Sequence, residues 1–403
     1  MPFRDAWLHV GALLVLLGFA ASVPTLAAIG FAVVLIGAVT RYWSRHLFDR
    51  VTFTARLGEH RAFIDEDVPL SLSLENRKLV PLPWYEWRLT LADPIRVRDE
   101  HLIAQAVPGY SWLLRRGALG WYQRHDWEFA VHSGVRGYHQ LGPVAIRSSD
   151  LLGIFPRVHE PLETENLIVF PRVVSLQDLG LPGDRPFGER KGRDRVFEDP
   201  LRISGLREYR PGDPLRRIDW KATARRGDLQ ARVYEPSATH QFYLLMNIDT
   251  LEHAWEGYLP NELERTVTAT ASIAVWAAGA RYSVGLLANG SFPGSDRPIR
   301  LPPSRSAEQL PRLLEALAVI QPLTMGDLAG AIHRESGRMP IGSTVVVVAS
   351  LAPPTLVGAV LRLASEGNRV SVVATSERID PADFPGIEVH QARWAYEPLG
   401  VPS

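Results

Sequence analysis

The sequence predicts an α+β protein of several domains, with membrane-spanning segments at the N-terminus, a β-rich region in the middle and an α/β region at the C-terminus. Three patterns carry this prediction. Two apolar stretches open the chain, short segments of alternating apolar and polar residues follow, and continuous apolar segments separated by amphipathic stretches occupy the second half. At 403 residues, 46% of them hydrophobic, the chain has room for two or three domains with substantial cores.

Residues 1–50 are expected to form a transmembrane helical hairpin. The stretches 7–23 and 26–39 carry no charged side chain and are separated at Pro24. Each is close to the length that crosses a hydrocarbon core once its interfacial residues are included. Arginines flank the hairpin on its outer ends only: Arg4, Arg41, Arg45 and Arg50. By the positive-inside rule both ends lie in the cytoplasm, which predicts a multi-pass protein of the cell membrane whose soluble domains face the cytoplasm.

A cleaved signal peptide is the alternative interpretation of the first apolar stretch. The apolar region continues past the turn, however, and no small-residue cleavage pattern separates it from the basic residues that follow. We therefore expect the hairpin to remain on the chain and to contact the lipid bilayer.

Residues 51–175 are expected to form a β-sandwich-like domain. Apolar and polar residues alternate at 68–74 and again at 127–131, which is the period of half-buried strands. Two packed antiparallel sheets are the simplest way to bury such strands. Five tryptophans are expected to pack in the core or at sheet edges, in preference to forming a carbohydrate- or peptide-binding face: Trp84, Trp87, Trp112, Trp121 and Trp127.

Residues 176–200 are rich in glycine, proline and charge, and we expect a linker or an extended loop there. Residues 201–395 then hold apolar strands that alternate with amphipathic helices, before a tail at 396–403. The expected strands are 242–248, 282–287, 344–349 and 370–374, and the expected helices are 261–280, 306–320 and 354–366. This alternation predicts a mostly parallel sheet covered on both faces by helices.

The segment 205–225 reads GLREYRPGDPLRRIDWKATAR, in which cations outnumber acids although the whole chain has 44 of each. The Pro-Gly pair at 211–212 predicts a turn. Asp213 is expected to cap a short helix over 214–226, and Gly227 is expected to end it.

Eleven residues of this segment are the candidate signature or interface residues: Arg207, Glu208, Tyr209, Pro211, Gly212, Asp213, Arg216, Arg217, Asp219, Trp220 and Lys221. Two roles are open for them. The arginines either form ion pairs with acids of the same fold, or they dock an acidic surface of another protein or a phosphate, which the guanidinium fork binds well.

This segment closely resembles the signature of a bacterial and archaeal family called domain of unknown function fifty-eight, which carries similar Arg-Glu-Tyr, Pro-Gly-Asp and Ile-Asp-Trp-Lys runs. Further similarity lies upstream at 136–143, 149–155 and 169–171, so that the resemblance covers residues 50 to 300. The resemblance implies a membrane-anchored β-domain followed by a von Willebrand factor A-like α/β domain. Such proteins are often encoded beside MoxR-type AAA+ ATPases and transglutaminase-like proteins, and an ATPase of that type is the partner that the resemblance implies.

Asp249 follows an expected strand, at the sheet edge where open α/β sheets bind ligands. In von Willebrand factor A-like domains an aspartate at this place begins an Asp-x-Ser-x-Ser motif that holds magnesium. The two hydroxyl positions are Leu251 and His253 here, and Thr250 is one residue out of register. Asp249 with Asn247 and waters would hold Mg²⁺ only weakly, so a structural or interface aspartate is preferred to a metal ligand.

Composition and motifs disfavour several classes of function. Balanced charge leaves no net field to attract nucleic acid, and the absence of cysteine removes disulfides, thiolate metal sites and cysteine nucleophiles. The sequence has no P-loop, no His-Glu-x-x-His and no Gly-x-Ser-x-Gly motif.

We therefore expect a membrane-anchored, non-enzymatic scaffold or adaptor without a cofactor, which binds a MoxR-type AAA+ ATPase. Two alternatives stay open. One is a metal-dependent ligand-binding domain or hydrolase that uses Asp249. The other is an envelope-facing protein that binds wall polymers through its tryptophans, which requires the opposite topology.

Overall fold

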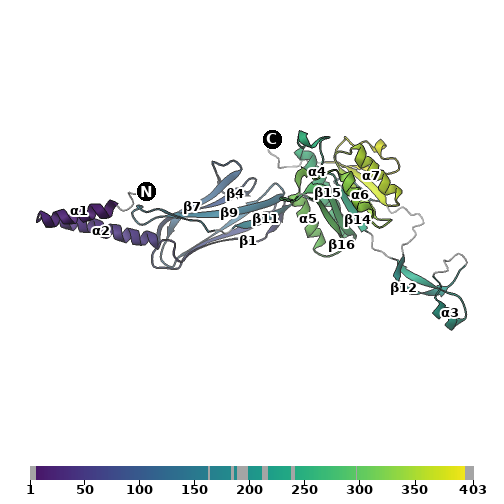
Figure 1. Cartoon of the computed structure of the whole chain (residues 1–403), viewed down its shortest axis with the longest axis horizontal. Helices are drawn as coiled ribbons and strands as arrows, with labels where there is room; N and C mark the ends of the chain where they lie inside the picture. Colours follow the sequence, from purple (N-terminus) through teal and green to yellow (C-terminus); the bar gives the residue numbers. More distant parts are fainter. Residues whose placement is uncertain are drawn as a thin grey trace. The chain divides into compact units, whose positions relative to one another are not determined.

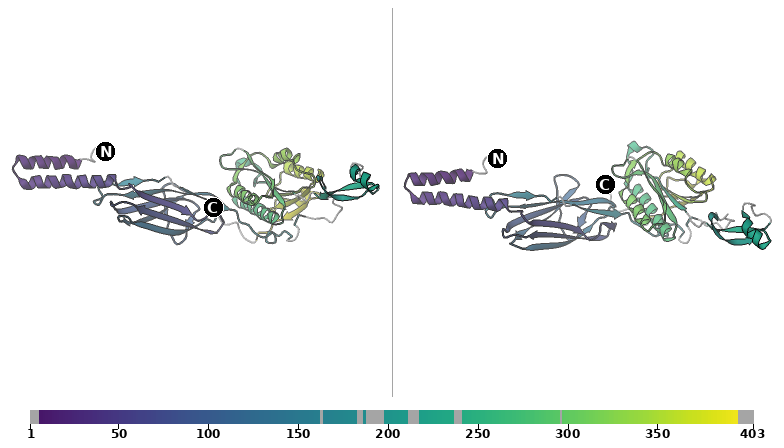
Figure 2. Two further views of the ribbon diagram at one scale, coloured as in Figure 1. Left: turned by 90° about the horizontal axis from the view of Figure 1, so that it is seen from below. Right: turned by 60° about the horizontal axis from the view of Figure 1, so that its bottom comes forward.

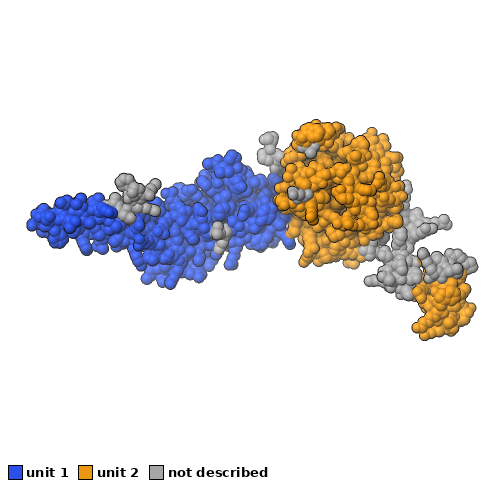
Figure 3. Space-filling view, in the orientation of Figure 1, with its two compact units in different colours: residues 1–172, 399–403 blue, residues 173–398 orange. Residues whose placement is uncertain are grey.

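The computed structural model, whose elements are labelled in Figure 1, describes these parts of the chain: 6–161, 164–182, 186–187, 198–210, 217–236, 241–295 and 297–394. The chain divides into two compact units, the first ending at Arg172 and the second beginning at Val173 (Figure 3). The structure contains α-helices as well as several β-sheets, which confirms the predicted α+β class.

Two apolar helices, α1 (Ala6–Ala20) and α2 (Pro24–Arg45), open the first unit. They approach each other closely at glycines. A Cβ added at Gly30, for example, would lie 2.6 Å from the backbone nitrogen of Val15. Small residues at helix contacts are typical of helices that pack within membranes.

Among the described residues, α2 is the helix that is long and apolar enough to cross a membrane, and the apolar stretch of α1, Trp7–Ala20, is shorter. The 22 residues of α2 extend over about 33 Å, close to the thickness of a hydrocarbon core. One N-terminal helix therefore has the properties of a membrane span. The second span and the orientation remain predictions.

The rest of the first unit is a β-domain of two sheets. Its strands are β1 Val51–Leu57, β2 Arg61–Phe63, β3 Asp67–Asn76, β4 Leu82–Ala92, β5 Arg96–Val97, β6 Ile103–Ala104, β7 Tyr110–Leu119, β8 Arg124–His132, β9 Gly137–Ser148, β10 Arg157–His159 and β11 Glu165–Phe170. One sheet has the order β1-β3-β8-β5 and the other β2-β11-β9-β4-β7-β6, with β10 beside β9. Paired strands are antiparallel except β2 and β11.

The two sheets share one core, in which Trp87 of β4 is fully buried. Its ring contacts Phe53 of β1 and Trp127 and Phe129 of β8, with ring centroids 5.9, 5.4 and 6.3 Å away. Because β4 belongs to one sheet and β1 and β8 to the other, these contacts join the sheets. The β-domain thus has the packing of a β-sandwich.

The tryptophans of the β-domain do not all behave as expected. Trp87 and Trp127 lie in or against the core, and Trp84 and Trp112 are partly buried on the sheets. Trp121 is 69% exposed in the turn between β7 and β8. The prediction of core or edge packing is wrong at Trp121, because a turn residue beyond the strand ends has no sheet face to cover it.

The second unit holds an open α/β sheet. Its strands are β14 Gln241–Met246, β15 Ser283–Ser291, β16 Pro298–Ser304, β17 Gln321–Thr324, β18 Thr344–Ala349, β19 Arg369–Ala374 and β20 Glu388–Gln391. Its helices are α4 Pro260–Gly279, α5 Gln309–Val319, α6 Leu328–Ser336 and α7 Pro354–Ser365, with the short 3₁₀ turns η3 Ala254–Glu256 and η4 Pro381–Asp383. The order is β16-β15-β14-β18-β19-β20, with β17 beside β15. All pairings are parallel except those of β16 and β17.

Helices cover both faces of this sheet (Figure 2). Tyr243 and Leu245 of β14 pack in one cluster with Ile332 of α6 and Val360 of α7. Phe242 points to the opposite face, where its ring centroid lies 6.1 Å from that of Trp276 in α4. Burial on both faces explains why these strands appear in the sequence as continuous apolar runs.

Part of the segment expected to be a linker packs against the α/β domain. Leu176, Leu179 and Leu181 are buried, and the ring of Phe187 lies 5.7 Å from that of Phe242. Residues 188–197 lie outside the described residues. The core of the second unit therefore includes side chains that precede its first strand.

Candidate functional site

The signature segment folds as a β-hairpin with a short helix between its strands. Strands β12 (Glu198–Glu208) and β13 (Gln230–Pro236) pair antiparallel, and α3 (Trp220–Arg226) lies in their connection. Ile218 forms an isolated bridge with the buried Ala231, which ties the start of the helical connection to β13.

Asp219 determines where α3 begins. Its Oδ1 accepts hydrogen bonds from the backbone N–H groups of Lys221 and Ala222, at 3.1 and 3.0 Å, and so caps the helix. Its Oδ2 accepts a hydrogen bond from Nε of Arg232 on β13, at 3.0 Å. The bond from Ala222, together with that from Arg232, holds the pKa of Asp219 below its usual value.

The predicted start of the helix is wrong. Instead of running from position 214, α3 begins at Trp220, because Asp219 has an extended backbone (φ −90°, ψ 95°) and caps the helix itself. Gly227 ends the helix as predicted, with a left-handed φ of 83°. The expected cap, Asp213, lies outside the described residues.

The described candidate residues fall at two places in the hairpin: Arg207, Glu208 and Tyr209 at the end of β12, and Arg217, Asp219, Trp220 and Lys221 at the entry to α3. The candidates outside the described residues are Pro211, Gly212, Asp213 and Arg216. The indole of Trp220 is 67% exposed, and Lys221 and Arg225 are exposed on the same helix.

Gln230 and Arg232 complete the hairpin, although neither is a predicted site residue. The buried Gln230 accepts the N–H of Asp219 at its carbonyl, at 2.8 Å, and donates its own N–H to Thr223 Oγ1, at 3.0 Å. Asp219 before the helix and Gly227 after it are capping residues that could have been recognised in the sequence. The partnership of Arg232 with Asp219 depends on the strand register, which the sequence does not reveal.

The second candidate site is the carboxyl edge of the α/β sheet at the end of β14, which has β15 on one side and β18 on the other. Asp249 stands just beyond β14. Its Oδ2 accepts a hydrogen bond from Asn289 Nδ2 at 2.8 Å, and its Oδ1 accepts one from Thr324 Oγ1 at 2.9 Å. Burial raises the pKa of Asp249 above its ordinary value in spite of these bonds.

Asn289 of β15 is fully buried and bridges two strands. Its Oδ1 accepts the N–H of Ile248 at 2.8 Å, while its Nδ2 donates to Asp249. On the other side, Asn247 Nδ2 donates to the carbonyl of Leu351 beyond β18 at 2.9 Å. Polar groups from three neighbouring strands therefore satisfy one another at this edge.

The polar residues that follow Asp249, where the sequence departs from the magnesium motif, contact other groups of the fold. Thr250 Oγ1 accepts the N–H of Leu259 at 2.8 Å, and the ring of His253 stacks on that of Trp255 with centroids 4.1 Å apart. In the part of the chain that the structure describes, no three His, Asp or Glu side chains lie close enough to share a metal ion. Whether Asp249 has a structural role or binds a metal stays a prediction; in the structure its carboxylate accepts hydrogen bonds from Asn289 and Thr324.

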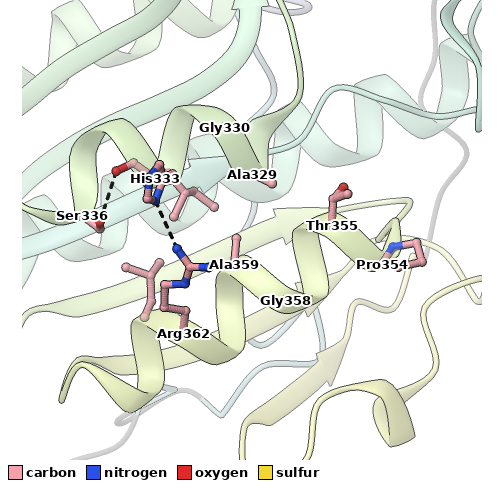
Figure 4. A pocket seen from close by; sticks show the side chains of 11 residues that line it. Ala329, Gly330, His333, Ser336, Pro354, Thr355, Gly358, Ala359 and Arg362 are labelled. Atoms are coloured by element: carbon pink, nitrogen blue, oxygen red, sulfur yellow. Dashed lines mark hydrogen bonds between the residues drawn. The ribbon is translucent and has the colours of Figure 1, made fainter.

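The second unit also carries hollows away from both candidate sites. One of about 570 Å³ lies between α6 and α7, lined by small residues and by His333 and Arg362, whose Nδ1 and guanidinium nitrogen are 3.2 Å apart (Figure 4). Another of about 1050 Å³ lies beyond β19 and β20 and is lined by charges of both signs, among them Glu262 and Arg378. Neither hollow includes Asp249 or a signature residue, so neither combines with these sites.

The fold and the hairpin define a class of protein: an apolar N-terminal helix pair, a β-sandwich domain, and an open α/β domain preceded by a charged hairpin. Residues 205–384 match the family described as "Protein of unknown function DUF58". The match confirms the resemblance drawn from the signature segment. The matched part begins in β12 and extends through η4.

A relative in Bacillus subtilis (strain 168), "Uncharacterized protein YeaD", is 25% identical over 168 residues. The aligned part is 40% of this chain and 38% of YeaD, so the chain spans well under half the length of that relative. Among solved structures, a cohesin module of a Clostridium perfringens family 33 glycoside hydrolase covers 30% of this chain and 96% of the module, with 12% identity and a TM-score of 0.22. A non-cellulosomal cohesin from Archaeoglobus fulgidus covers 29% and 91%, with 12% identity and a TM-score of 0.20. Scores this low carry no argument.

Proposed function

We propose that this protein is a membrane-anchored, non-enzymatic adaptor that binds a MoxR-type AAA+ ATPase through its signature hairpin. The exposed indole of Trp220 is the observation that carries the proposal. It stands on a helix whose start is fixed by Asp219 and whose end is fixed by Gly227, so the indole is presented from a defined backbone. Tryptophan, tyrosine and arginine are the residue types most enriched at the energetic centres of protein interfaces.

The charges of the hairpin favour an acidic partner surface. Two arginines have partners within the hairpin: Arg232 Nε donates a hydrogen bond to Asp219, and Arg226 Nη1 lies 3.4 Å from Gln230 Oε1. Lys221 and Arg225 are exposed on the same helix as Trp220. Cations around an aromatic side chain speed encounter with an acidic surface and orient it, while burial of the ring supplies affinity.

The proposed anchor is a transmembrane hairpin of α1 and α2. The length and apolarity of α2 and the glycine contacts between the helices support it. Positive charge at the outer ends of the helix pair, such as Arg4 and Arg45, supports the proposal that both ends and the soluble domains lie in the cytoplasm. The α/β domain is proposed to be von Willebrand factor A-like, which the mostly parallel sheet and the position of Asp249 support.

Affinity purification of the full-length, detergent-solubilised protein from its native host tests the proposal. An AAA+ ATPase identified by mass spectrometry is expected to co-purify in an ATP-dependent manner, and Trp220→Ala is expected to abolish its recovery. Trp255→Ala is the matched control, because Trp255 is 80% exposed and lies outside the hairpin. Equal recovery of the ATPase with both variants would exclude the hairpin as the docking surface.

A reporter fused to the C-terminus tests the proposed topology. We expect the activity of a cytoplasmic reporter, because positive charge flanks both outer ends of the helix pair. Activity of a reporter that functions only outside the cytoplasm would refute the adaptor model and favour wall-polymer binding.

A further inference from the structure

One end of the β-domain displays large apolar side chains on three loops. These side chains are between 52% and 71% exposed and form what we call the loop-tip patch: Leu79 between β3 and β4, Trp121 and Tyr122 between β7 and β8, and Leu151, Leu152 and Ile154 between β9 and β10. Single apolar residues are common on protein surfaces, but several on neighbouring loops mark a surface that meets another apolar phase.

Two of these loops contact the last turn of α2 directly. Trp43 Nε1 donates a hydrogen bond to the carbonyl of Pro81, at 3.2 Å, in the loop that carries Leu79. Ser44 Oγ donates to the carbonyl of Phe155, at 3.1 Å, next to Ile154 in the third loop. These loops therefore lie where the apolar run of α2 ends.

The remaining loop is held to the first. The backbone N–H of Tyr122 lies 3.3 Å from the carbonyl of Lys78, which precedes Leu79. The buried amide of Asn76 reaches both loops, donating to the carbonyl of Gly120 at 2.7 Å and to that of Val80 at 3.1 Å. All three loops thus lie around the same end of the β-domain.

We propose that the loop-tip patch rests in the interfacial layer of the bilayer that α2 enters. This inference depends on the proposed membrane anchor. Arg41 marks the end of the uncharged part of α2, and its guanidinium lies 5.6 Å from the ring of Phe155, so the patch stands at the level where the helix leaves the apolar phase. Tryptophan and tyrosine prefer that level, and arginine meets the lipid phosphates there.

Continuity with α2 favours lipid over another protein as the occupant. Val39 and Tyr42, in the last turns of α2, are exposed as the patch is, so the apolar surface of the helix runs on toward the loops. A bilayer around α2 covers both surfaces at once. A second copy of the chain would instead have to displace lipid from α2 to reach the loops.

Single-cysteine labelling of the full-length chain tests the inference, since the native sequence has no cysteine. The variants Trp121→Cys and Leu152→Cys carry the fluorophore NBD in the patch. Leu35→Cys reports insertion of α2. Val107→Cys is the matched control, because Val107 is 57% exposed but lies before β7, whereas Trp121 lies beyond its other end. The labelled proteins are reconstituted in vesicles of phosphatidylcholine and phosphatidylglycerol, with and without lipid that carries a doxyl quencher at a shallow acyl position.

We expect blue-shifted emission and loss of intensity with doxyl lipid at positions 121, 152 and 35, and neither change at position 107. Quenching at position 35 with positions 121 and 152 no more quenched than 107 would overturn the patch while leaving the anchor in place. Absence of quenching at position 35 would remove the anchor and the patch together. A blue shift at 121 or 152 without doxyl quenching would identify a protein contact and reject the bilayer.

Discussion

The carboxyl edge of the α/β sheet and the loop-tip patch of the β-domain differ in where their side chains point. At the sheet edge, Asp249, Asn289 and Thr324 are turned toward one another, and both oxygens of the carboxylate accept hydrogen bonds. At the patch, Trp121 and Leu152 are turned outward. A buried polar group without a hydrogen-bond partner is costly, and so is a large apolar patch exposed to water. The polar groups at the sheet edge find their partners within the fold, whereas the apolar side chains of the patch are left to contact another apolar phase.

The largest expected effect is at the sheet edge, in the variant Asn289→Ala. It removes the acceptor of the buried Ile248 N–H and one of the donors to the partly buried carboxylate of Asp249. We expect the free energy of unfolding to fall by about 2–4 kcal/mol, because two polar groups lose a hydrogen-bond partner. Urea unfolding in detergent measures this loss of stability. The exposed Asn261→Ala is the control and should change stability by less than about 0.5 kcal/mol. Equal losses would show that Asn289 has no bridging role.

Asp249→Asn should cost less, about 1–3 kcal/mol, because the amide keeps one acceptor oxygen and replaces the other with a donor, so one of the hydrogen bonds from Asn289 and Thr324 must rearrange. The pH dependence of the unfolding free energy distinguishes the loss of the ionisable group from a change in packing. Burial raises the pKa of Asp249, so the folded protein holds this proton more tightly than the unfolded chain. The stability of the wild type relative to Asp249→Asn should therefore rise as the pH falls from neutrality through the folded pKa. A difference that stays constant over that range would contradict the raised pKa.

Lys78 lies next to Leu79 of the patch, and burial lowers its pKa to about 8. Its Nζ donates to the carbonyl of Leu47 at 2.7 Å. Between pH 8 and the usual lysine pKa of about 10.4, the unfolded chain binds more protons than the folded protein at this site. The wild type should therefore gain stability relative to Lys78→Met as the pH rises from 8 to 10. A parallel course of the two unfolding curves with pH would show that Lys78 titrates normally.

The smallest expected effect on folding is at the patch, where Leu152→Ser should change the unfolding free energy in detergent by less than about 0.5 kcal/mol, because its side chain is already exposed. Leu72→Ala, in the core of the same domain, is the contrast and should cost about 2–5 kcal/mol. A large loss for Leu152→Ser would mean that the patch packs within the protein.

Addition of magnesium tests whether the sheet edge also binds a ligand. Because both carboxylate oxygens of Asp249 already accept hydrogen bonds, millimolar Mg²⁺ should leave the melting temperature of the full-length protein unchanged. An increase that Asp249→Ala removes would revive the metal-dependent alternative.

The sequence predicted the regular parts of the fold where burial imposes a period. The segment 68–74 lies within β3, and 344–349 matches β18, because one strand alternates and the other is buried on both faces. The hairpin of β12 and β13 was not predicted from the sequence. The sequence of β12 is rich in charge and neither strand is a continuous apolar run, and the pairing joins residues such as Arg207 and Ala231 across the whole connection.

The candidate sites were predictable in position but not in detail. Asp249 lies at the sheet edge where the pattern placed it, but its partners come from other strands. Asn289 belongs to the last part of β15, which continues beyond the predicted end at residue 287, and Thr324 ends β17. Which polar residues meet at a sheet edge depends on strand order, and a single sequence does not reveal strand order.

The buried amide of Asn76 has a further consequence for the β-domain. By holding the carbonyls of Val80 and Gly120 at once, it reduces the independent motion of two loop tips before they meet any lipid. Side chains on loops that are already ordered lose little conformational entropy on contact, so more of the hydrophobic gain remains as affinity. An orientation of the β-domain on a bilayer would thus be determined by a rigid base and not by the gradual folding of flexible loops.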